Sequence, residues 1–538
     1  MPDNIQMPDA PGAWSRWWVS AAAGIIALAA ALRFGTLGRI PAGLYFDEAM
    51  YCLDALTVGR GGHWPVFFPA NFGREPLYIY SLSAAFALFG AEVPVARLVS
   101  AFWGTLAVAA LLPVARRAVG PWWALAAVFV MAVFRWPLHF SCTIFRAVMP
   151  PLFILFSVWA FLRWRERRRP LDAVMCGAAL GGGLYTYTSF RLVPLMFAAW
   201  VIYQFLRGLL VWRRDACSLA VIVLTAVLVA APLGVHFVRH PDDLSSRTGE
   251  ISMFSHHGVM KPPAEILRGL GRNARDIALM WTVRGDHVGR HNLPYRPVFD
   301  WLTGLFFYSG LVWCVWRVGR EESAFLCLTW ILTLACASLF SFGAPNLLRM
   351  QGMTPAVALV LVIGLRWAWE VSAPLASRSL RTAAVLALLV FFATMQLFDF
   401  FVRFPNHPAV RREFLVEMFY APAMAARDMA PGVAQFRVPA ELADHPTFRF
   451  VTHAAHNIVA YGPSDPVTSG PRPLGILTTL RASELASPAQ RAEIAGLEKM
   501  PGARRMATLP VSVEAPEGSP ARWLPWAEIW VLDEPGGK

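Results

Sequence analysis

Long apolar segments dominate this sequence and constrain its fold more than any other feature. Eleven of them approach or reach the roughly 20 residues that a helix needs to cross a bilayer. They lie at about 17–34, 94–115, 121–139, 147–163, 172–190, 192–211, 216–238, 298–316, 323–342, 350–369 and 382–402. Only 15% of the 538 residues are charged, against about a quarter in soluble proteins. We therefore predict an α-helical, polytopic membrane protein.

A shorter apolar run, Leu77–Ala91, decides the orientation of these spans. If this run does not cross and the N-terminus is cytoplasmic, the arginine clusters near 116, 163–169, 207–214, 317–320 and 378–381 all face the cytoplasm, as the positive-inside rule requires. If it crosses, every cluster faces outward. We therefore predict about eleven spans, a cytoplasmic N-terminus and a juxtamembrane helix at Leu77–Ala91 on the outer face.

The segment after the last span is polar and rich in proline, which divides the chain into a membrane domain, 1–402, and an extracytoplasmic domain, 403–538. Runs at 448–451, 474–477 and 527–532 have the composition of strands. Ser487 before Pro488 predicts the start of a helix over 487–498. A small α/β domain is the simplest architecture for this region.

An acidic pair, Asp47 and Glu48, follows the first apolar run closely. Charge beside a hydrophobic span is costly unless it is paired or functional. A partly desolvated carboxylate at the membrane edge suits a general base that takes a proton from a hydroxyl group. The alternative is a pair of first-turn acids that stabilise the dipole of a helix beginning near Ala49.

Twelve arginines lie at the predicted outer ends of spans or in outer loops, where arginine is disfavoured, and four of them are candidates for binding an anionic group. These four are Arg74, Arg146, Arg191 and Arg349. A guanidinium group matches the geometry of phosphate, so this set predicts a site for the phosphate of a lipid-linked substrate. Anchoring of the same side chains to lipid headgroups is the alternative.

Five further residues are candidates for substrate contact. They are Glu75, Tyr78, His291, Asn292 and Arg296. Glu75 opens the juxtamembrane helix, and three interpretations are open for it. It is only a first-turn acid, it orients Arg74, or it faces Asp47 across one cavity. His291, Asn292 and Arg296 belong to a polar, aromatic cluster in the long 239–297 loop, just before a span. The alternative to substrate contact is that this cluster is part of a solvated loop without a binding role.

The order of these motifs resembles the polytopic GT-C glycosyltransferases that use polyprenyl-phosphate sugars, in particular the protein O-mannosyltransferase and aminoarabinose-transferase-like family (family 39-like). The matching residues are Asp47-Glu48, Glu75-Pro76-Leu77-Tyr78, Ala96 to Ser100, Ala115 to Gly120 and Arg349. The resemblance implies a GT-C fold and transfer of a hexosyl or pentosyl group, with inversion, to an acceptor hydroxyl outside the bacterial inner membrane. It also implies that Asp47 is the base.

One departure from the family concerns metal. Members commonly carry a second acid in the second outer loop, and some bind a divalent cation there. The corresponding turn here, Ser141 to Pro150, has no acid. Mg²⁺ or Mn²⁺ is therefore an open cofactor, with Asp47 as the one candidate ligand, and Arg146 is a candidate to neutralise the leaving phosphate in its place.

Two other classes compete with the enzyme. A lipid-linked sugar transporter or flippase would place its site near the bilayer midplane on broken helices, whereas the ionisable residues here gather at the predicted outer face. A structural membrane protein would have no use for the outer arginines. The expected partners are the bilayer, a polyprenyl-phosphate-linked sugar and a glycan, lipid or protein acceptor; no nucleic acid is expected.

Overall fold

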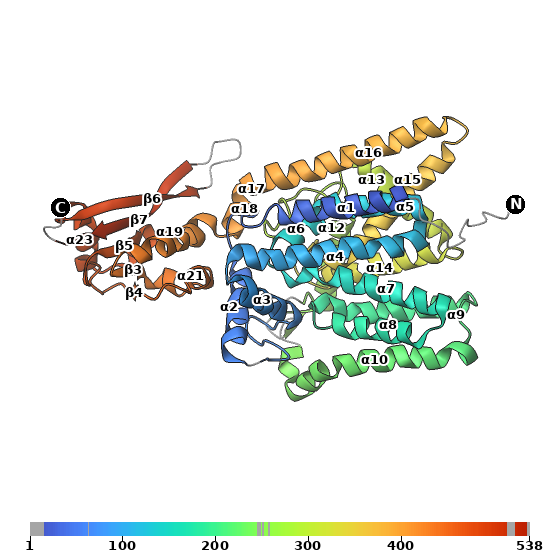
Figure 1. Ribbon diagram of the computed structural model, residues 1–538, viewed down its shortest axis with the longest axis horizontal. Helices are drawn as coiled ribbons and strands as arrows, with labels where there is room; N and C mark the ends of the chain where they lie inside the picture. The colour runs from blue at the N-terminus through green and yellow to red at the C-terminus, as the bar shows by residue number, and fades with distance from the viewer. Residues whose placement is uncertain are drawn as a thin grey trace.

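The computed structural model describes residues 16–534, apart from 63, 245–248, 250–251, 257–258 and 514–521. A bundle of long helices forms the larger part of the molecule, and a five-stranded sheet with short helices lies beyond one end of it (Figure 1). The chain is a multi-pass membrane protein by the length and composition of its helices.

Within the described residues, eight helices are long and apolar enough to cross a membrane. They form around α1 (Arg16–Phe34), α4 (Val93–Val119), α7 (Pro150–Arg167), α9 (Val193–Leu206), α10 (Trp212–Arg239), α14 (Glu322–Leu339), α15 (Thr354–Val371) and α16 (Arg378–Phe398). The number is nine if α5 (Pro121–Val133) and α6 (Arg135–Cys142), which meet at a 50° bend, make one span.

The two remaining predicted spans are also helical but shorter than predicted. The run at 172–190 contains α8 (Pro170–Gly183), with 14 residues, and the run at 298–316 contains α13 (Trp301–Arg317), with 17 residues. Each of the eleven apolar runs therefore contains a helix.

Glycines in α8 bring its backbone against α10. A Cβ atom on Gly177 would lie 2.3 Å from the carbonyl oxygen of Ile222, and one on Gly181 would lie 2.5 Å from that of Ala226. Small residues four positions apart permit this approach, and lipid-embedded helices associate largely through such close packing. Most of α10 is otherwise exposed, so α8 provides its main attachment to the bundle.

We expect Gly181→Val to destabilise the protein, because the new side chain has no space between α8 and α10. Overpacking of this kind costs about 1–3 kcal/mol. Thermal denaturation of the detergent-solubilised protein measures the effect. Gly24→Val in α1 is the matched control, since a Cβ atom there meets nothing within 4 Å. Equal stability of the two variants would contradict the tight α8–α10 contact.

Two helices outside the long spans lie beside the end of the bundle that faces the sheet, as Figure 1 shows. They are α2 (Phe46–Gly61) and α3 (Leu77–Phe89). The helix predicted at Leu77–Ala91 is thus present, with 13 residues. The loop between α10 and α13 holds a short hairpin, β1 (Ser255–His256) with β2 (Val259–Met260), and α12 (Pro263–Leu279).

The C-terminal region forms the predicted α/β domain. Short helical segments lead to it: η4 (Asp399–Arg403), α17 (Phe404–Asn406), α18 (Pro408–Glu413), η5 (Val416–Tyr420) and α19 (Ala421–Met429). The sheet has the order β4-β3-β5-β7-β6. Its strands are β3 (Gln435–Pro439), β4 (Ile458–Tyr461), β5 (Leu474–Thr479), β6 (Ala503–Val513) and β7 (Arg522–Leu532). The first three are parallel, and β7 runs antiparallel to its neighbours β5 and β6.

Local predictions in this domain had mixed outcomes. The strands at 474–477 and 527–532 are confirmed, and α23 (Pro488–Gly496) begins after Ser487, whose hydroxyl accepts from the backbone N–H of Gln490. The strand predicted at 448–451 is wrong, because these residues belong to α21 (Pro446–Val451). Pro446 occupies the first turn of this helix, a position that proline favours. The run is rich in apolar residues, as a strand would be, because most residues of this short helix are buried. Two other short helices, α20 (Ala440–Ala443) and α22 (Leu480–Leu485), follow β3 and β5.

Candidate functional site

The two acids at the start of α2 have different surroundings. Glu48 is fully buried, and its carboxylate accepts two backbone hydrogen bonds, from the N–H of Tyr45 at 2.8 Å and from the N–H of Ile144 at 2.7 Å. The first bond is half of a capping box that closes the beginning of the helix. Burial raises the pKa of Glu48, against the opposing effects of Arg97 and of these two N–H groups. Glu48 therefore joins α2 to the turn that carries Arg146.

Asp47 is only partly buried and accepts one hydrogen bond, at 2.7 Å, from the side-chain amide of Asn71. Asn71 and Phe72 have positive φ angles of 54° and 61° in a tight loop that is closed by a bridge between Phe68 and Arg74. The loop thus orients one oxygen of a carboxylate that is accessible to a ligand. Of the predicted pair, Asp47 has the surroundings that suit a general base.

Glu75 lies between two of the predicted phosphate-binding arginines. Its carboxylate pairs with Nε of Arg146 at 3.1 Å and with Nη2 of Arg191 at 3.5 Å, and it accepts from the hydroxyl of Thr188 at 3.0 Å. Arg146 and Glu75 are each about 1% exposed. The pair is too deep for solvent to screen it well, so it holds a fixed geometry.

The Arg146 guanidinium also lies between two aromatic rings, 5.8 Å from the centre of Tyr51 and 5.3 Å from that of Tyr187. Asp47 is close enough to interact electrostatically with both Arg146 and Arg290. Arg290 stacks over Tyr45 at 4.8 Å. Asp47 therefore lies near phenol rings and near two arginines that each have a carboxylate partner, Arg146 with Glu75 and Arg290 with Glu413 at 2.6 Å.

Arg74 pairs with Asp54, whereas Glu75, for which orientation of Arg74 was one of three alternatives, pairs with Arg146 and Arg191. Nη2 of Arg74 is 2.9 Å from Oδ2 of Asp54 in α2, and the Arg74 guanidinium lies 5.7 Å from the ring centre of Tyr51. Desolvation raises the pKa of Asp54 to about 6 in spite of this partner. Arg74 and Arg146 therefore both lie near the ring of Tyr51, and Arg74 is joined to α2 by its pair with Asp54.

The remaining predicted substrate residues make internal contacts. The Tyr78 hydroxyl is 2.5 Å from that of Ser100, inside the contact between α3 and α4. His291 and Asn292 bond to Asp286 within their own loop, and Nε of Arg296 lies 2.6 Å from the buried Asp399 after α16. His291, Asn292 and Arg296 therefore hold the 284–296 loop in place, and this loop positions Arg290 beside Tyr45.

An apolar pocket of about 310 Å³ adjoins this cluster. Arg191 and Arg349 both line it, together with Tyr187, Thr188, Leu192, Phe254, Phe340 and Ser341. The Arg349 guanidinium bonds to the hydroxyl of Ser341 and to the carbonyl oxygen of Phe342. Since Tyr187 and Thr188 also contact the Arg146–Glu75 pair, the pocket and the pair share a wall. Two guanidinium groups on apolar walls suit a phosphate that carries a hydrocarbon chain.

The residues near Asp47 do not form a good metal site. Among the described residues there is no group of three or more His, Cys, Asp or Glu side chains that could hold an ion. Asp47 is already bonded to an amide, and the neighbouring acids have other partners: Glu48 accepts from two backbone N–H groups, Glu75 pairs with Arg146 and Glu413 pairs with Arg290. Oxygen-rich coordination of the kind that Mg²⁺ requires is therefore not provided by these side chains.

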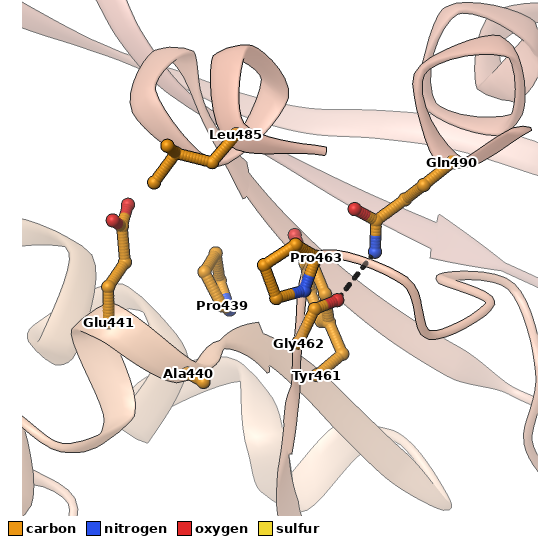
Figure 2. Close-up of a pocket in the computed structure, with 8 residues that line it drawn as sticks. All are labelled: Pro439, Ala440, Glu441, Tyr461, Gly462, Pro463, Leu485 and Gln490. Carbon is orange, nitrogen blue, oxygen red and sulfur yellow. Dashed lines mark hydrogen bonds between the residues drawn. The ribbon is translucent and has the colours of Figure 1, made fainter. Parts of the chain in front are cut away.

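A second pocket, of about 70 Å³, lies in the C-terminal domain at the carboxyl ends of β3 and β4. Figure 2 shows Glu441 and Leu485 on one side of it and Gln490 on the other, where its side-chain amide donates to the carbonyl oxygen of Gly462. None of the predicted site residues lines this pocket.

Several residues of the site were not predicted from the sequence. Asn71, Tyr51, Tyr45, Tyr187 and Arg290 belong to this group. Arg290 is one of the outer arginines of the sequence but not one of the four chosen as phosphate-binding candidates, and it is adjacent to the predicted His291. Tyr51 lies in α2, whereas Tyr45 precedes α2 and Tyr187 precedes the short helical turn Thr188–Leu192, so no common spacing marks the three tyrosines as a group.

Comparisons with known proteins agree with this architecture. Residues 73–236 match the family model described as dolichyl-phosphate-mannose-protein mannosyltransferase. The structure of ArnT from Cupriavidus metallidurans bound to undecaprenyl phosphate is similar, with a TM-score of 0.50 and 16% identity, over 98% of this chain and 99% of that chain. Its shared fold confirms the predicted GT-C class.

More distant similarities also exist. Archaeal oligosaccharyltransferase AglB from Archaeoglobus fulgidus, in complex with an inhibitory peptide and a dolichol-phosphate, has a TM-score of 0.48 and 14% identity, over 83% of this chain and 65% of that chain. The S. cerevisiae Pmt1-Pmt2 complex bound to the sugar donor has a TM-score of 0.35 and 19% identity, over 43% and 35%. Among functionally curated proteins, no sequence matches this chain significantly.

Proposed function

We propose that this chain, a membrane protein with the GT-C fold of the ArnT and protein O-mannosyltransferase type, transfers a sugar from a polyprenyl-phosphate carrier to an acceptor hydroxyl. The observation that carries the proposal is the apolar pocket with Arg191 and Arg349 on its wall, next to the buried Arg146–Glu75 pair. The undecaprenyl phosphate in the ArnT structure supports a carrier of this chemical class.

The donor phosphate would bind between the guanidinium groups, with its hydrocarbon chain along Phe254, Phe340 and Leu192. Guanidinium groups form bidentate, charge-assisted bonds to phosphate oxygens. Since Arg191 already faces Glu75 and Arg349 already faces Ser341, little side-chain entropy is lost when the phosphate binds.

Asp47 would act as the general base. It takes the proton of the acceptor hydroxyl as that oxygen attacks the anomeric carbon. The bond from this carbon to the phosphate oxygen breaks, and the polyprenyl phosphate leaves with the bonding electron pair. Attack opposite the leaving group inverts the anomeric carbon, and Arg146 stabilises the negative charge that develops on the phosphate.

The proposed transfer takes place at one particular end of the helix bundle. The acceptor would approach on the outer face of a bacterial inner membrane, at the end of the bundle where α2, α3 and the C-terminal domain lie (Figure 1). Residues 1–402 would form the catalytic membrane domain and 403–538 the extracytoplasmic domain. The ion pairs described for the site involve this end of the bundle rather than the middle of the spans, which favours transfer over transport across the bilayer.

Replacement of both pocket arginines tests donor binding. A hydrogen bond to a charged group contributes about 1.5–3 kcal/mol, which is about 10-fold to 100-fold in affinity for each bond lost. We therefore expect the double variant Arg191→Gln with Arg349→Gln to bind undecaprenyl phosphate at least about 100-fold more weakly. Binding is measured on purified protein, and the KM for the sugar donor should rise in parallel. Arg366→Gln is the control, because Arg366 forms a half-exposed pair with Glu370 elsewhere, on α15. Unchanged affinity of the double variant would refute the proposed donor site.

A further inference from the structure

The C-terminal domain touches the backbone immediately before Asp47. The hydroxyl of Thr447, in the first turn of α21, donates to the carbonyl oxygen of Leu44 at 3.1 Å. Both residues are fully buried. The bond spans 403 residues of sequence, so it joins the domain directly to the segment that enters α2.

A ring contact reinforces this bond. The imidazole of His445 stacks on Phe419 with 3.7 Å between ring centres and meets the edge of Phe46 at 5.6 Å. Burial lowers the pKa of His445 to about 4, so the ring is neutral at ordinary pH and packs as an aromatic group. Phe46 is the residue before Asp47, and its side chain is therefore held by the domain.

The bundle also holds this segment. Arg97 in α4 donates to the carbonyl oxygens of Pro41 and Gly43, and Glu48 accepts from the N–H of Tyr45. The linker to the domain packs against Gly43 so closely that a Cβ atom there would lie 2.1 Å from the carbonyl oxygen of Phe414. Residues 41–46 are thus fixed between two bodies, and Thr447 supplies the bond at Leu44.

We infer that α21 is a positioning element for Asp47, so that the C-terminal domain contributes to catalysis through the backbone at Leu44. The inference rests on the proposed role of Asp47 as the base. A displacement of about 1 Å of a catalytic group from its reacting position can reduce a reaction rate about 100-fold. The donor pocket is lined by residues between 187 and 349, so loosening α21 should slow the chemical step while donor affinity is retained.

Thr447→Val, which removes the hydroxyl at constant volume, is the principal test. We expect kcat to fall roughly 10-fold to 100-fold, with undecaprenyl phosphate affinity within twofold of the wild type. Thr447→Ser keeps the hydroxyl that donates the hydrogen bond to Leu44, and it should have most of the wild-type kcat. Thr452→Val is the matched control, because the Thr452 hydroxyl bonds within its own helix, to Phe448. Equal losses in Thr447→Val and Thr452→Val, or a loss of donor affinity, would overturn the inference.

Two further variants keep the result interpretable. His445→Ala removes the ring between Phe46 and Phe419 and should also lower kcat with little effect on donor affinity, even if Thr447→Val is poorly folded. In the Asp47→Asn background, Thr447→Val should cause no additional loss, because both changes act on one group; additive losses would contradict the positioning role. Full activity of Thr447→Val beside an inactive Asp47→Asn refutes this inference alone, whereas full activity of Asp47→Asn refutes the proposed function itself.

Discussion

Asp47→Asn is expected to reduce sugar transfer by about 10²-fold to 10⁴-fold, which is the usual contribution of a general base. The amide has nearly the same shape as the carboxylate, and its oxygen can still accept from Asn71, so the loop should keep its geometry. The variant loses the ability to take a proton from the acceptor. Transfer is measured with a polyprenyl-phosphate sugar and purified protein, and the affinity for undecaprenyl phosphate should not change.

The neighbouring acid provides an internal contrast for this experiment. In Glu48→Gln, one of the two oxygens that accept from Tyr45 and Ile144 becomes an N–H₂ group, which leaves a buried donor facing a donor. We therefore expect a loss of stability of about 1–3 kcal/mol. Asp428→Asn, at an exposed surface pair, is the neutral control. If Asp47→Asn transfers sugar at the wild-type rate while remaining folded, Asp47 is not the base.

Asp47 and Glu48 have different surroundings, and the sequence near them could not predict the difference. Both acids follow an apolar run and open a helix, so composition alone does not distinguish them. What distinguishes them is the N–H of Ile144, 96 residues away, which binds Glu48 and leaves Asp47 at the surface of the site. The capping spacing from Tyr45 to Glu48 was visible, but tyrosine is not a usual capping residue.

Helices could be predicted much better than ion pairs. Apolar length alone predicts a span, because the bilayer imposes it, and all eleven runs contain helices. In contrast, the partners of Arg74, Arg146 and Arg296 are acids that the sequence gives no reason to choose: Asp54, Glu75 and Asp399. An arginine at a span end predicts a demand for negative charge, and the fold decides which carboxylate meets it.

The C-terminal domain illustrates a second kind of limit. The strands β5 and β7 are apolar runs and were predicted, whereas β3 and β4 were not. These two have five and four residues, and β3 contains Arg437 and ends at Pro439. The buried Arg437 side chain bonds to Ser469, which lies well outside its own strand. A charged residue in a short strand is tolerated only because of that distant partner.

The second large effect is expected at Arg146. Arg146→Gln should lower sugar transfer by about 10²-fold to 10³-fold, the usual result of removing one group that stabilises charge in the transition state. No divalent metal is added to the assay. Because Glu75 would remain buried without its main partner, we also expect a stability loss of about 3–5 kcal/mol.

A double variant separates these two effects. Glu75→Gln combined with Arg146→Gln removes both charges from the buried pair, and stability should return toward that of the wild type, since two neutral amides of similar size replace the ions. Transfer should stay low, because the guanidinium proposed to stabilise the charge that develops on the leaving phosphate is absent. Thermal denaturation and transfer rates are measured on the same preparations, with Arg163→Gln as the control for loss of a half-buried arginine at a pair with Asp172. Recovery of transfer together with stability would mean that Arg146 serves the fold and that another group stabilises the leaving phosphate; Arg191 would then be the first candidate, since it shares the carboxylate of Glu75 and lines the donor pocket.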